Sequence, residues 1–199
     1  FYITAYTVEI RNVVFKNGFS DESGGALLSL RDVQIFDCTF ISNRARDGSA
    51  IYTQSRFQTR ITGTKFISNT ATSSGSICNN GGSICIRDSK FISNESGQAG
   101  CIFNNDKGRL ISSGNEFTDN RAELASVMAN KGIVKSTNDV FSKNTSQVGG
   151  AFLNDGKIDF DEATFTENVS KNNYGCCISN QNQGDIKISN CHFLNNDTS

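Results

Sequence analysis

The sequence predicts an all-β protein folded as a parallel β-helix of about eight coils, each of ~25 residues. The first observation is a short phrase, FISN, which occurs at residues 40–43, 66–69 and 91–94. The second is composition, since 23 Asn, 18 Gly, 39 Ser or Thr and no Pro favour bends and short strands over long helices. The third is that apolar residues alternate in short runs at the same interval.

The repeat is defined by a Phe that is followed three residues later by an Asn. Seven of the 15 Phe satisfy this pattern, where random placement on this composition predicts about two. Phe15 belongs to an eighth copy, with Gly18 in place of the Asn. The Phe column is Phe15, Phe40, Phe66, Phe91, Phe117, Phe141, Phe165 and Phe193, and its steps are 25, 26, 25, 26, 24, 24 and 28 residues. The paired Asn column is Asn43, Asn69, Asn94, Asn120, Asn144, Asn168 and Asn196.

A second signature lies about 11 residues after each Phe. Small residues precede a large apolar one in GGAL at 24–27, GSAI at 48–51, SGSI at 74–77, AGCI at 99–102, ASVM at 125–128, GGAF at 149–152 and GCCI at 175–178. Two residues further on is a second Asn column, preceded by Ser29 and Thr53 in the first copies: Asn79, Asn104, Asn130, Asn154 and Asn180. Recurrence at constant spacing indicates that each copy forms the same structural unit.

Several copies also carry an apolar pair, seven and five residues before the Phe, such as Val33 and Ile35. This alternation of period two predicts a strand. Short strands joined by bends, with no helical stretch between them, exclude βαβ units, whose crossovers contain helices. We therefore expect each copy to make one circuit, with equivalent strands of successive circuits pairing at ~4.8 Å and inward side chains stacking on their own copies.

The Asn and Phe columns have a physical role in such a coil. A peptide group that is buried and unpaired at a corner costs ~1–3 kcal/mol. The Asn side chain carries a donor and an acceptor on a short arm, so stacked Asn residues can bond to one another and to the backbone of the bend. We expect both Asn columns to form buried ladders and the Phe column to fill the core beside the bend.

The paired signatures, Gly-Gly-Ala-(Ile, Leu or Val) and Phe-x-x-Asn, resemble the repeats of the chlamydial polymorphic outer membrane proteins and of similar repeat proteins on the surfaces of some protists. The resemblance covers all eight copies, about residues 8 to 196. It implies a right-handed β-helical passenger, displayed outside the cell and associated with adhesion. The chain departs from the pattern in five copies, where GGA is replaced by GSA, SGS, AGC, ASV and GCC.

Charge and cysteine usage exclude several classes of function. Nucleic acid is not expected as a partner, because 19 basic and 20 acidic residues are spread along the chain for a net charge of −1. No stretch approaches the ~18 consecutive apolar residues of a membrane-spanning helix. We expect no cofactor and no metal, since the seven Cys show no CxxC spacing and His192 is the single His. Cys78 and Cys85 flank the bend NNGG, which makes a disulfide between them a hypothesis.

Two outward features suggest a contact surface. Ile41, Ile67 and Ile92 follow the Phe in three consecutive copies and form a candidate contact stripe on a face that should be solvated. Simple β-propensity is the alternative explanation for the stripe. Alternation also predicts that the small residue before each large apolar one points outward, forming a row against which another rod or loop could lie: Ala26, Ala50, Ser76, Cys101, Val127, Ala151 and Cys177.

The functional alternative is a polysaccharide-processing enzyme, either a lyase or a hydrolase. The strongest acidic group comprises Asp155, Asp159, Asp161 and Glu162, with Glu167 nearby. Two carboxylates that face a groove ~5–9 Å apart can act as acid and base in glycoside hydrolysis. Against this reading, the sequence has no Trp to stack on sugars and no long loops to build a groove. A third class, ice binding, would need a regular outward Thr ladder, which the sequence lacks.

Four Asn-x-Ser/Thr sequons coincide with ladder residues, at Asn94, Asn144, Asn168 and Asn196. If the ladder is buried, these side chains cannot carry glycans. Glycans at these positions would place the Asn column outside and contradict this account of the bend.

We expect residues 1–199 to form a single β-helix domain. No capping segment is evident at either end, so the domain is predicted to be either a segment of a longer repeat protein or a subunit that stacks end to end into a filament. The predicted function is non-enzymatic, namely an extracellular structural or adhesive surface module. Its expected partner is a second copy, a cell-surface protein or a glycan, and the sequence leaves this choice open.

Overall fold

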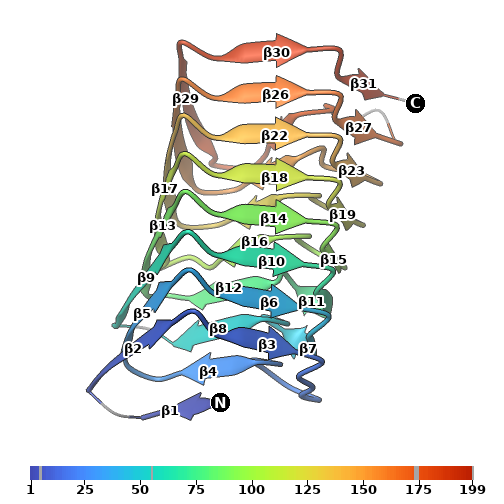
Figure 1. Cartoon of the computed structure of the whole chain (residues 1–199). Helices are drawn as coiled ribbons and strands as arrows, with labels where there is room; N and C mark the ends of the chain where they lie inside the picture. The colour runs from blue at the N-terminus through green and yellow to red at the C-terminus, as the bar shows by residue number, and fades with distance from the viewer. Residues whose placement is uncertain (5, 55, 173–174, 199) are drawn as a thin grey trace.

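The computed structural model is an all-β solenoid of about eight turns, and it describes residues 1–4, 6–54, 56–172 and 175–198. In Figure 1 the near strands run from left to right while the chain climbs from the N-terminal to the C-terminal end, and the return strands run behind them. The coil is therefore right-handed. The predicted parallel β-helix with a spacing of ~25 residues is confirmed.

The circuits build four parallel sheets, which we call A to D, and every circuit after the first contributes a strand to each of them. Sheet A consists of β1 (Tyr2–Ile3), β4 (Leu27–Ser29), β8 (Ile51–Gln54), β12 (Ile77–Asn80), β16 (Ile102–Asn104), β20 (Met128–Asn130), β24 (Phe152–Asn154) and β28 (Ile178–Asn180). Sheet B consists of β2 (Thr7–Arg11), β5 (Asp32–Phe36), β9 (Gln58–Thr62), β13 (Ser83–Arg87), β17 (Arg109–Ser113), β21 (Ile133–Thr137), β25 (Lys157–Asp161) and β29 (Asp185–Ser189).

Sheet C carries the Phe column, and sheet D follows the first Asn column. Sheet C consists of β3 (Val14–Lys16), β6 (Thr39–Ile41), β10 (Lys65–Ile67), β14 (Lys90–Ile92), β18 (Glu116–Thr118), β22 (Val140–Ser142), β26 (Thr164–Thr166) and β30 (His192–Leu194). Sheet D consists of β7 (Arg44–Asp47), β11 (Thr70–Ser74), β15 (Glu95–Ser96), β19 (Arg121–Ala122), β23 (Thr145–Ser146), β27 (Val169–Ser170) and β31 (Asp197–Thr198). Sequence reasoning found the strands of A, B and C but not those of D, most of which are two residues long.

The register places equal positions of successive copies directly opposite one another. Phe66 pairs with Phe40 on one side and with Phe91 on the other, and the rings are stacked with centroids 5.1 and 4.6 Å apart. The Phe side chains from Phe15 to Phe165 are buried, whereas Phe193 in the last circuit is partly exposed. The core is therefore a set of columns along the axis, in which each circuit buries its apolar side chains against the circuits before and after it.

At two corners of the coil, one residue adopts a positive φ in every circuit. The first corner is three residues before the Phe, between sheets B and C, with φ of 49–66° at Asn12, Asp37, Gly63, Asp88, Gly114, Asn138, Glu162 and Asn190. The second is two residues after the Phe, between sheets C and D, with φ of 51–57° at Asn17, Ser42, Ser68, Ser93, Asp119, Lys143, Glu167 and Asn195. Left-handed backbone is costly for residues with a Cβ, and Asn and Asp tolerate it best after Gly.

One expectation about side-chain direction is wrong. The small residues before the large apolar positions do not point outward, because Ala50, Cys101 and Val127 are fully buried in the core beside Ile51 and Ile102. The strands of sheet A begin at or just after the large apolar residue, so the small one lies on the bend that precedes the strand. Alternation of period two applies only within a strand, and two consecutive side chains can enter the core at a bend.

Candidate functional site

The first Asn column forms a buried ladder where the chain passes from sheet C to sheet D, as predicted. The backbone N–H and Nδ2 of Asn69 donate to Oδ1 of Asn94 at 3.0 and 3.1 Å, and Nδ2 also donates to the carbonyl of Phe40 at 3.0 Å. Oδ1 of Asn69 accepts the equivalent pair of bonds from Asn43. Every hydrogen-bonding position of the amide is therefore used. Of the sequon residues, Asn94, Asn144 and Asn168 are fully buried and Asn196 is half-buried.

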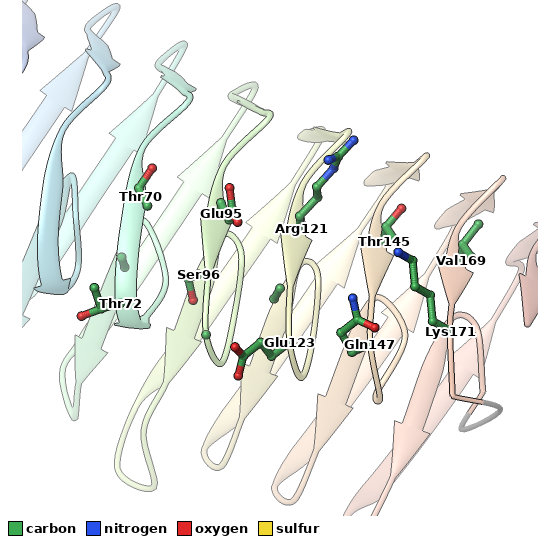
Figure 2. A pocket seen from close by; sticks show the side chains of 13 residues that line it. Thr70, Thr72, Glu95, Ser96, Arg121, Glu123, Thr145, Gln147, Val169 and Lys171 are labelled. Atoms are coloured by element: carbon green, nitrogen blue, oxygen red, sulfur yellow. The ribbon is translucent and has the colours of Figure 1, made fainter. Parts of the chain in front are cut away.

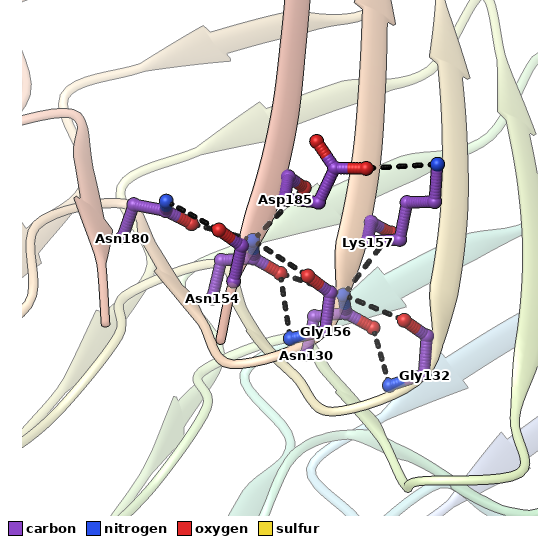
Figure 3. Close-up of polar contacts among 8 residues, drawn as sticks. Asn130, Gly132, Asn154, Gly156, Lys157, Asn180 and Asp185 are labelled. Carbon is purple, nitrogen blue, oxygen red and sulfur yellow. Dashed lines mark hydrogen bonds and ion pairs between the residues drawn. The ribbon is translucent and has the colours of Figure 1, made fainter. Parts of the chain in front are cut away.

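The second Asn column forms another ladder, between sheets A and B (Figure 3). Nδ2 of Asn130 donates to Oδ1 of Asn154 at 2.8 Å and to the carbonyl of Gly132 at 3.2 Å. The N–H of Gly132 donates back to Oδ1 of Asn130 at 3.0 Å. Each amide therefore joins two circuits and closes its own bend. The ladder residues from Asn79 to Asn154 are buried, whereas Asn180 is exposed.

A glycine column accompanies this second ladder. It lies two to four residues after each Asn and comprises Gly82, Gly108, Gly132, Gly156 and Gly184. A Cβ on Gly132 would lie 2.1 Å from the carbonyl oxygen of Gly108, so the close approach of successive bends requires glycine. Sequence reasoning missed this column because its distance from the Asn varies, although a Gly within four residues of each Asn was a readable signal.

A third polar column lies two residues before the Phe and was also missed. The backbone N–H of Thr64 donates to Oγ of Ser89 at 3.1 Å, and that of Ser89 to Oδ1 of Asn115 at 2.8 Å. Asn115 in turn donates through its N–H to Oδ1 of Asp139 at 2.8 Å, and Ser136 donates to Oδ2 of Asp139 at 2.6 Å. Asp139 is fully buried, and burial raises the pKa of its carboxyl against the opposing effect of these hydrogen bonds.

Within the part of the chain that the structure describes, all seven cysteines are free thiols. Cys78 and Cys85 are both free thiols on strands of different sheets, β12 and β13, so the disulfide hypothesis is not supported. Burial raises the pKa of the Cys78 thiol to about 12. Within the described ranges, no group of three or more His, Cys, Asp or Glu side chains is placed to hold a metal ion.

The candidate contact stripe is a continuous feature of the outer face of sheet C. Ile67 pairs directly with Ile41 and with Ile92, so the three side chains lie side by side on adjacent strands. All three are half-buried. The stripe ends at Thr118 on the next strand, β18.

The predicted acidic group is brought together only in part: Asp159 and Asp161 line the same hollow on sheet B, and the other members lie apart from them. Asp159 lies between Lys135 and Lys187 in the cross-strand register of sheet B, and Asp161 accepts a hydrogen bond from Asn190 at 2.9 Å. The hollow beside these two carboxylates is small, ~300 Å³. The remaining members are elsewhere, since Asp155 accepts from Asn182 at 2.7 Å, while Glu162 and Glu167 stand at the two corners.

A larger groove of ~720 Å³ runs along sheet D (Figure 2). Figure 2 shows two rows of outward side chains, one from Thr70 through Glu95 and Arg121 to Val169 and the other from Thr72 to Lys171. Small buried residues lie between the two rows and form the floor of the groove, as at Ala71, Ser96 and Ala122. The groove crosses five circuits, which corresponds to ~19 Å at the strand spacing.

The groove combines a fixed frame with mixed charge. Backbone bonds between circuits hold the second row, as in the donation from the N–H of Lys171 to the carbonyl of Ser146 at 3.1 Å. Glu95 and Glu123 supply negative charge, and Arg121 and Lys171 supply positive charge, so the lining is close to neutral overall. Such a lining suits an extended polar ligand with charges of both signs. The groove was missed because sheet D itself was missed.

Comparison with known proteins does not assign the chain to a family: no protein-family model, no curated protein and no solved structure matches it. Among the residues that the structure describes, there is no helix long and apolar enough to cross a bilayer.

Proposed function

We propose that this chain is a non-enzymatic, extracellular adhesive module that binds an extended polypeptide segment of a cell-surface protein in the groove of sheet D. The observation that carries the proposal is the groove itself, which crosses five circuits and is lined by outward polar side chains. An extended peptide advances ~3.3 Å per residue, so about six residues fit its length. The resemblance to surface-displayed adhesive repeats supports the extracellular setting.

Rigidity supports this function. One Asn ladder closes the bend between sheets C and D and the other closes the bend between sheets A and B, so the outward side chains project from a backbone that needs little ordering on binding. A preorganised surface loses less conformational entropy on association than a flexible one. The groove carries Glu95 near one end, Arg121 and Glu123 in its middle circuit and Lys171 at the other end, and this charge pattern would select a segment of complementary pattern.

The proposal is tested by selecting displayed short peptides that bind the chain. A double variant, Arg121→Glu with Glu123→Arg, reverses the local charge pattern but keeps the net charge. The matched control exchanges the exposed ion pair of sheet C, Lys90→Glu with Glu116→Lys, whose members are 2.8 Å apart. We expect selected peptides to lose binding to the groove variant and to keep binding to the control. Peptides that bind both variants equally, or a selection that enriches nothing, would overturn the proposal.

The alternative, a polysaccharide-processing enzyme, is favoured by one observation: Glu95 and Glu123 line the same groove, with Arg121 beside them. Glycoside hydrolysis uses two carboxylates of this kind. A glycan-cleavage screen of the unmodified chain, with Glu95→Gln and Glu123→Gln as one variant and Asp159→Asn and Asp161→Asn as another, decides this question. Cleavage that only the first variant abolishes would establish the enzyme and displace the adhesive proposal.

A further inference from the structure

The outer face of sheet B carries one cation on each of four consecutive strands. These are Arg60 on β9, Arg87 on β13, Arg109 on β17 and Lys135 on β21, and all four side chains are exposed. None of these four strands contains an Asp or a Glu. We call this face the basic strip. It lies on a different sheet from the groove of sheet D and is independent of the function proposed for that groove.

The register spreads the four cations evenly along the axis. Arg60 and Lys135 occupy the same cross-strand row, which also contains Cys85 and Ile111, while Arg87 and Arg109 lie two residues to either side of it. Three strand steps separate the first cation from the last, a distance of ~14 Å along the coil. The strip therefore presents one positive charge per circuit, with Arg87 and Arg109 at opposite ends of their paired strands.

The four cations of the strip are not held in ion pairs. All ion pairs found among the described residues lie elsewhere, and none includes Arg60, Arg87, Arg109 or Lys135. The strip ends at the next strand, β25, where Asp159 faces Lys135 and Lys157 is paired with Asp185 at 2.8 Å.

Besides Asp159, carboxylates border the strip at two places. Asp88 lies at the corner after β13. Asp32 lies on β5, the strand before β9 in sheet B, and its carboxylate accepts a hydrogen bond from the N–H of Gln58 at 2.6 Å. The four cations therefore form a local concentration of positive charge on a chain whose net charge is −1.

Between the cations the face is flat and lacks aromatic rings. Ile111 and Ile133 are exposed by 41% and 42%, and hydroxyl side chains such as Thr62 and Ser113 fill other outward positions. Single-stranded nucleic acids are held mainly by basic grooves with aromatic platforms for the bases, which this strip does not offer. Guanidinium groups bind sulfate and carboxylate groups in a bidentate manner, and flanking hydroxyls can bond to sugar hydroxyls.

We propose that the basic strip binds a linear anionic polysaccharide, one that carries sulfate or carboxylate groups along its length. The chain would lie along the axis of the coil with its charged groups over successive circuits. An anionic polymer releases counterions when cations replace them, so the affinity should fall as salt rises, with a slope set by the number of contacts.

The test is titration of the protein with heparin, a sulfated polysaccharide, at several salt concentrations. The strip variant is Arg87→Gln, Arg109→Gln and Lys135→Gln. Its matched control removes the same charge from exposed positions of sheets C and D outside the groove, Lys16→Gln, Arg44→Gln and Lys65→Gln. We expect the strip variant to bind at least about tenfold more weakly and to lose about three units of salt slope, while the control binds as the unmodified protein does.

Two results would overturn the proposal. Equal weakening by both variants, or no binding by the unmodified protein, would show that the strip is not a site. Equally tight binding of poly-glutamate or of single-stranded oligothymidine, with the same loss in the strip variant, would show that the ligand class is wrong. Peptide binding by the groove of sheet D is unaffected by the strip variant, so failure of either proposal is recognised separately.

Discussion

Nδ2 of Asn94 donates to Oδ1 of Asn120 at 3.0 Å, and the backbone N–H of Asn94 donates to the same oxygen at 2.9 Å. This double donation links each Asn from Asn43 to Asn168 to the Asn one circuit ahead. Because the corner of the coil interrupts the ladders of sheets C and D, the amide supplies the bonds that the sheets leave open. The ladder explains why the sequence repeats Phe-x-x-Asn and not simply an apolar residue.

Replacing one Asn of the first ladder should lower the stability of the protein. Asn94→Ala leaves the N–H of Asn69 and the carbonyl of Phe66 without their partners, in a fully buried site. Each orphaned group costs ~1–3 kcal/mol, so we expect the free energy of unfolding to fall by about 2–4 kcal/mol. Urea denaturation measures this change. The control, Asn172→Ala at an exposed position, should change the free energy by less than ~0.5 kcal/mol; equal small effects would refute the role of the rung.

The Phe column makes a similar prediction by a different mechanism. Phe91 is fully buried and stacked between Phe66 and Phe117, with centroids 4.6 and 4.7 Å away. Phe91→Ala should lower the free energy of unfolding by ~3–5 kcal/mol, because the transfer term and the cavity add. Phe19 is 69% exposed, and Phe19→Ala should cost less than ~0.5 kcal/mol in the same assay. A loss under ~1 kcal/mol at Phe91 would count against inward stacking.

Asp139 predicts an unusual dependence of stability on pH. Burial raises its pKa in the folded protein above the value of the unfolded chain. Folding therefore favours the protonated form of Asp139. The stability that this carboxyl contributes is complete at a pH below the unfolded pKa and is lost as the pH rises through the folded pKa. Each unit by which the pKa is raised corresponds to about 1.4 kcal/mol at high pH.

Replacing the carboxyl of Asp139 by an amide should remove the loss of stability at high pH. In Asp139→Asn the amide can adopt the arrangement of Asn115, whose Nδ2 donates to Ser112 at 2.9 Å and to the carbonyl of Ile86 at 3.0 Å. We expect the variant to match the unmodified protein near pH 4 and to exceed its stability at pH 7 and above. Thermal unfolding across this range measures both. A variant that is less stable at every pH would show that the carboxylate itself is required.

At the corner between sheets B and C, two substitutions should change the free energy of unfolding in opposite directions. Glu162 is exposed and has a φ of 55°, in the same column as Gly63 and Gly114. Glu162→Gly should raise the free energy of unfolding by ~0.5–1 kcal/mol, because glycine adopts this conformation without steric cost. Gly114→Ala should lower it by ~1–2 kcal/mol, since φ is +66° and the new Cβ would lie 2.8 Å from Oδ1 of Asp88. Changes in the free energy of unfolding that are equal and of the same sign would contradict the positive φ at these two positions.

The parts of the fold that sequence reasoning found are those where one residue type repeats. The Phe and Asn columns can be recognised in the sequence because a stacked position favours the same side chain in every circuit. The third polar column was invisible for the opposite reason, since Thr64, Ser89, Asn115 and Asp139 share only an acceptor oxygen and burial. The corner columns were equally mixed, because any residue that tolerates a positive φ can serve there.

The candidate sites were harder to foresee than the architecture. The groove depends on sheet D, whose two-residue strands such as Arg121–Ala122 have no periodicity to detect. The basic strip depends on register: Arg87 and Arg109 occupy different positions in their copies, and only the pairing of β13 with β17 places them on one face, at opposite ends of the two strands. The orientation of Ala50 and Val127 was mistaken because alternation was extended from a strand into a bend.

The most direct test of the ladder is hydrogen exchange at the side-chain amides of Asn69, Asn94 and Asn120, followed by NMR. All three Nδ2 groups are buried and make two hydrogen bonds each. We predict that they exchange only through opening of the coil, far more slowly than the exposed amide of Asn172. Exchange at the rate of Asn172 would mean that these side chains are open to water, and the account of the corner would be wrong.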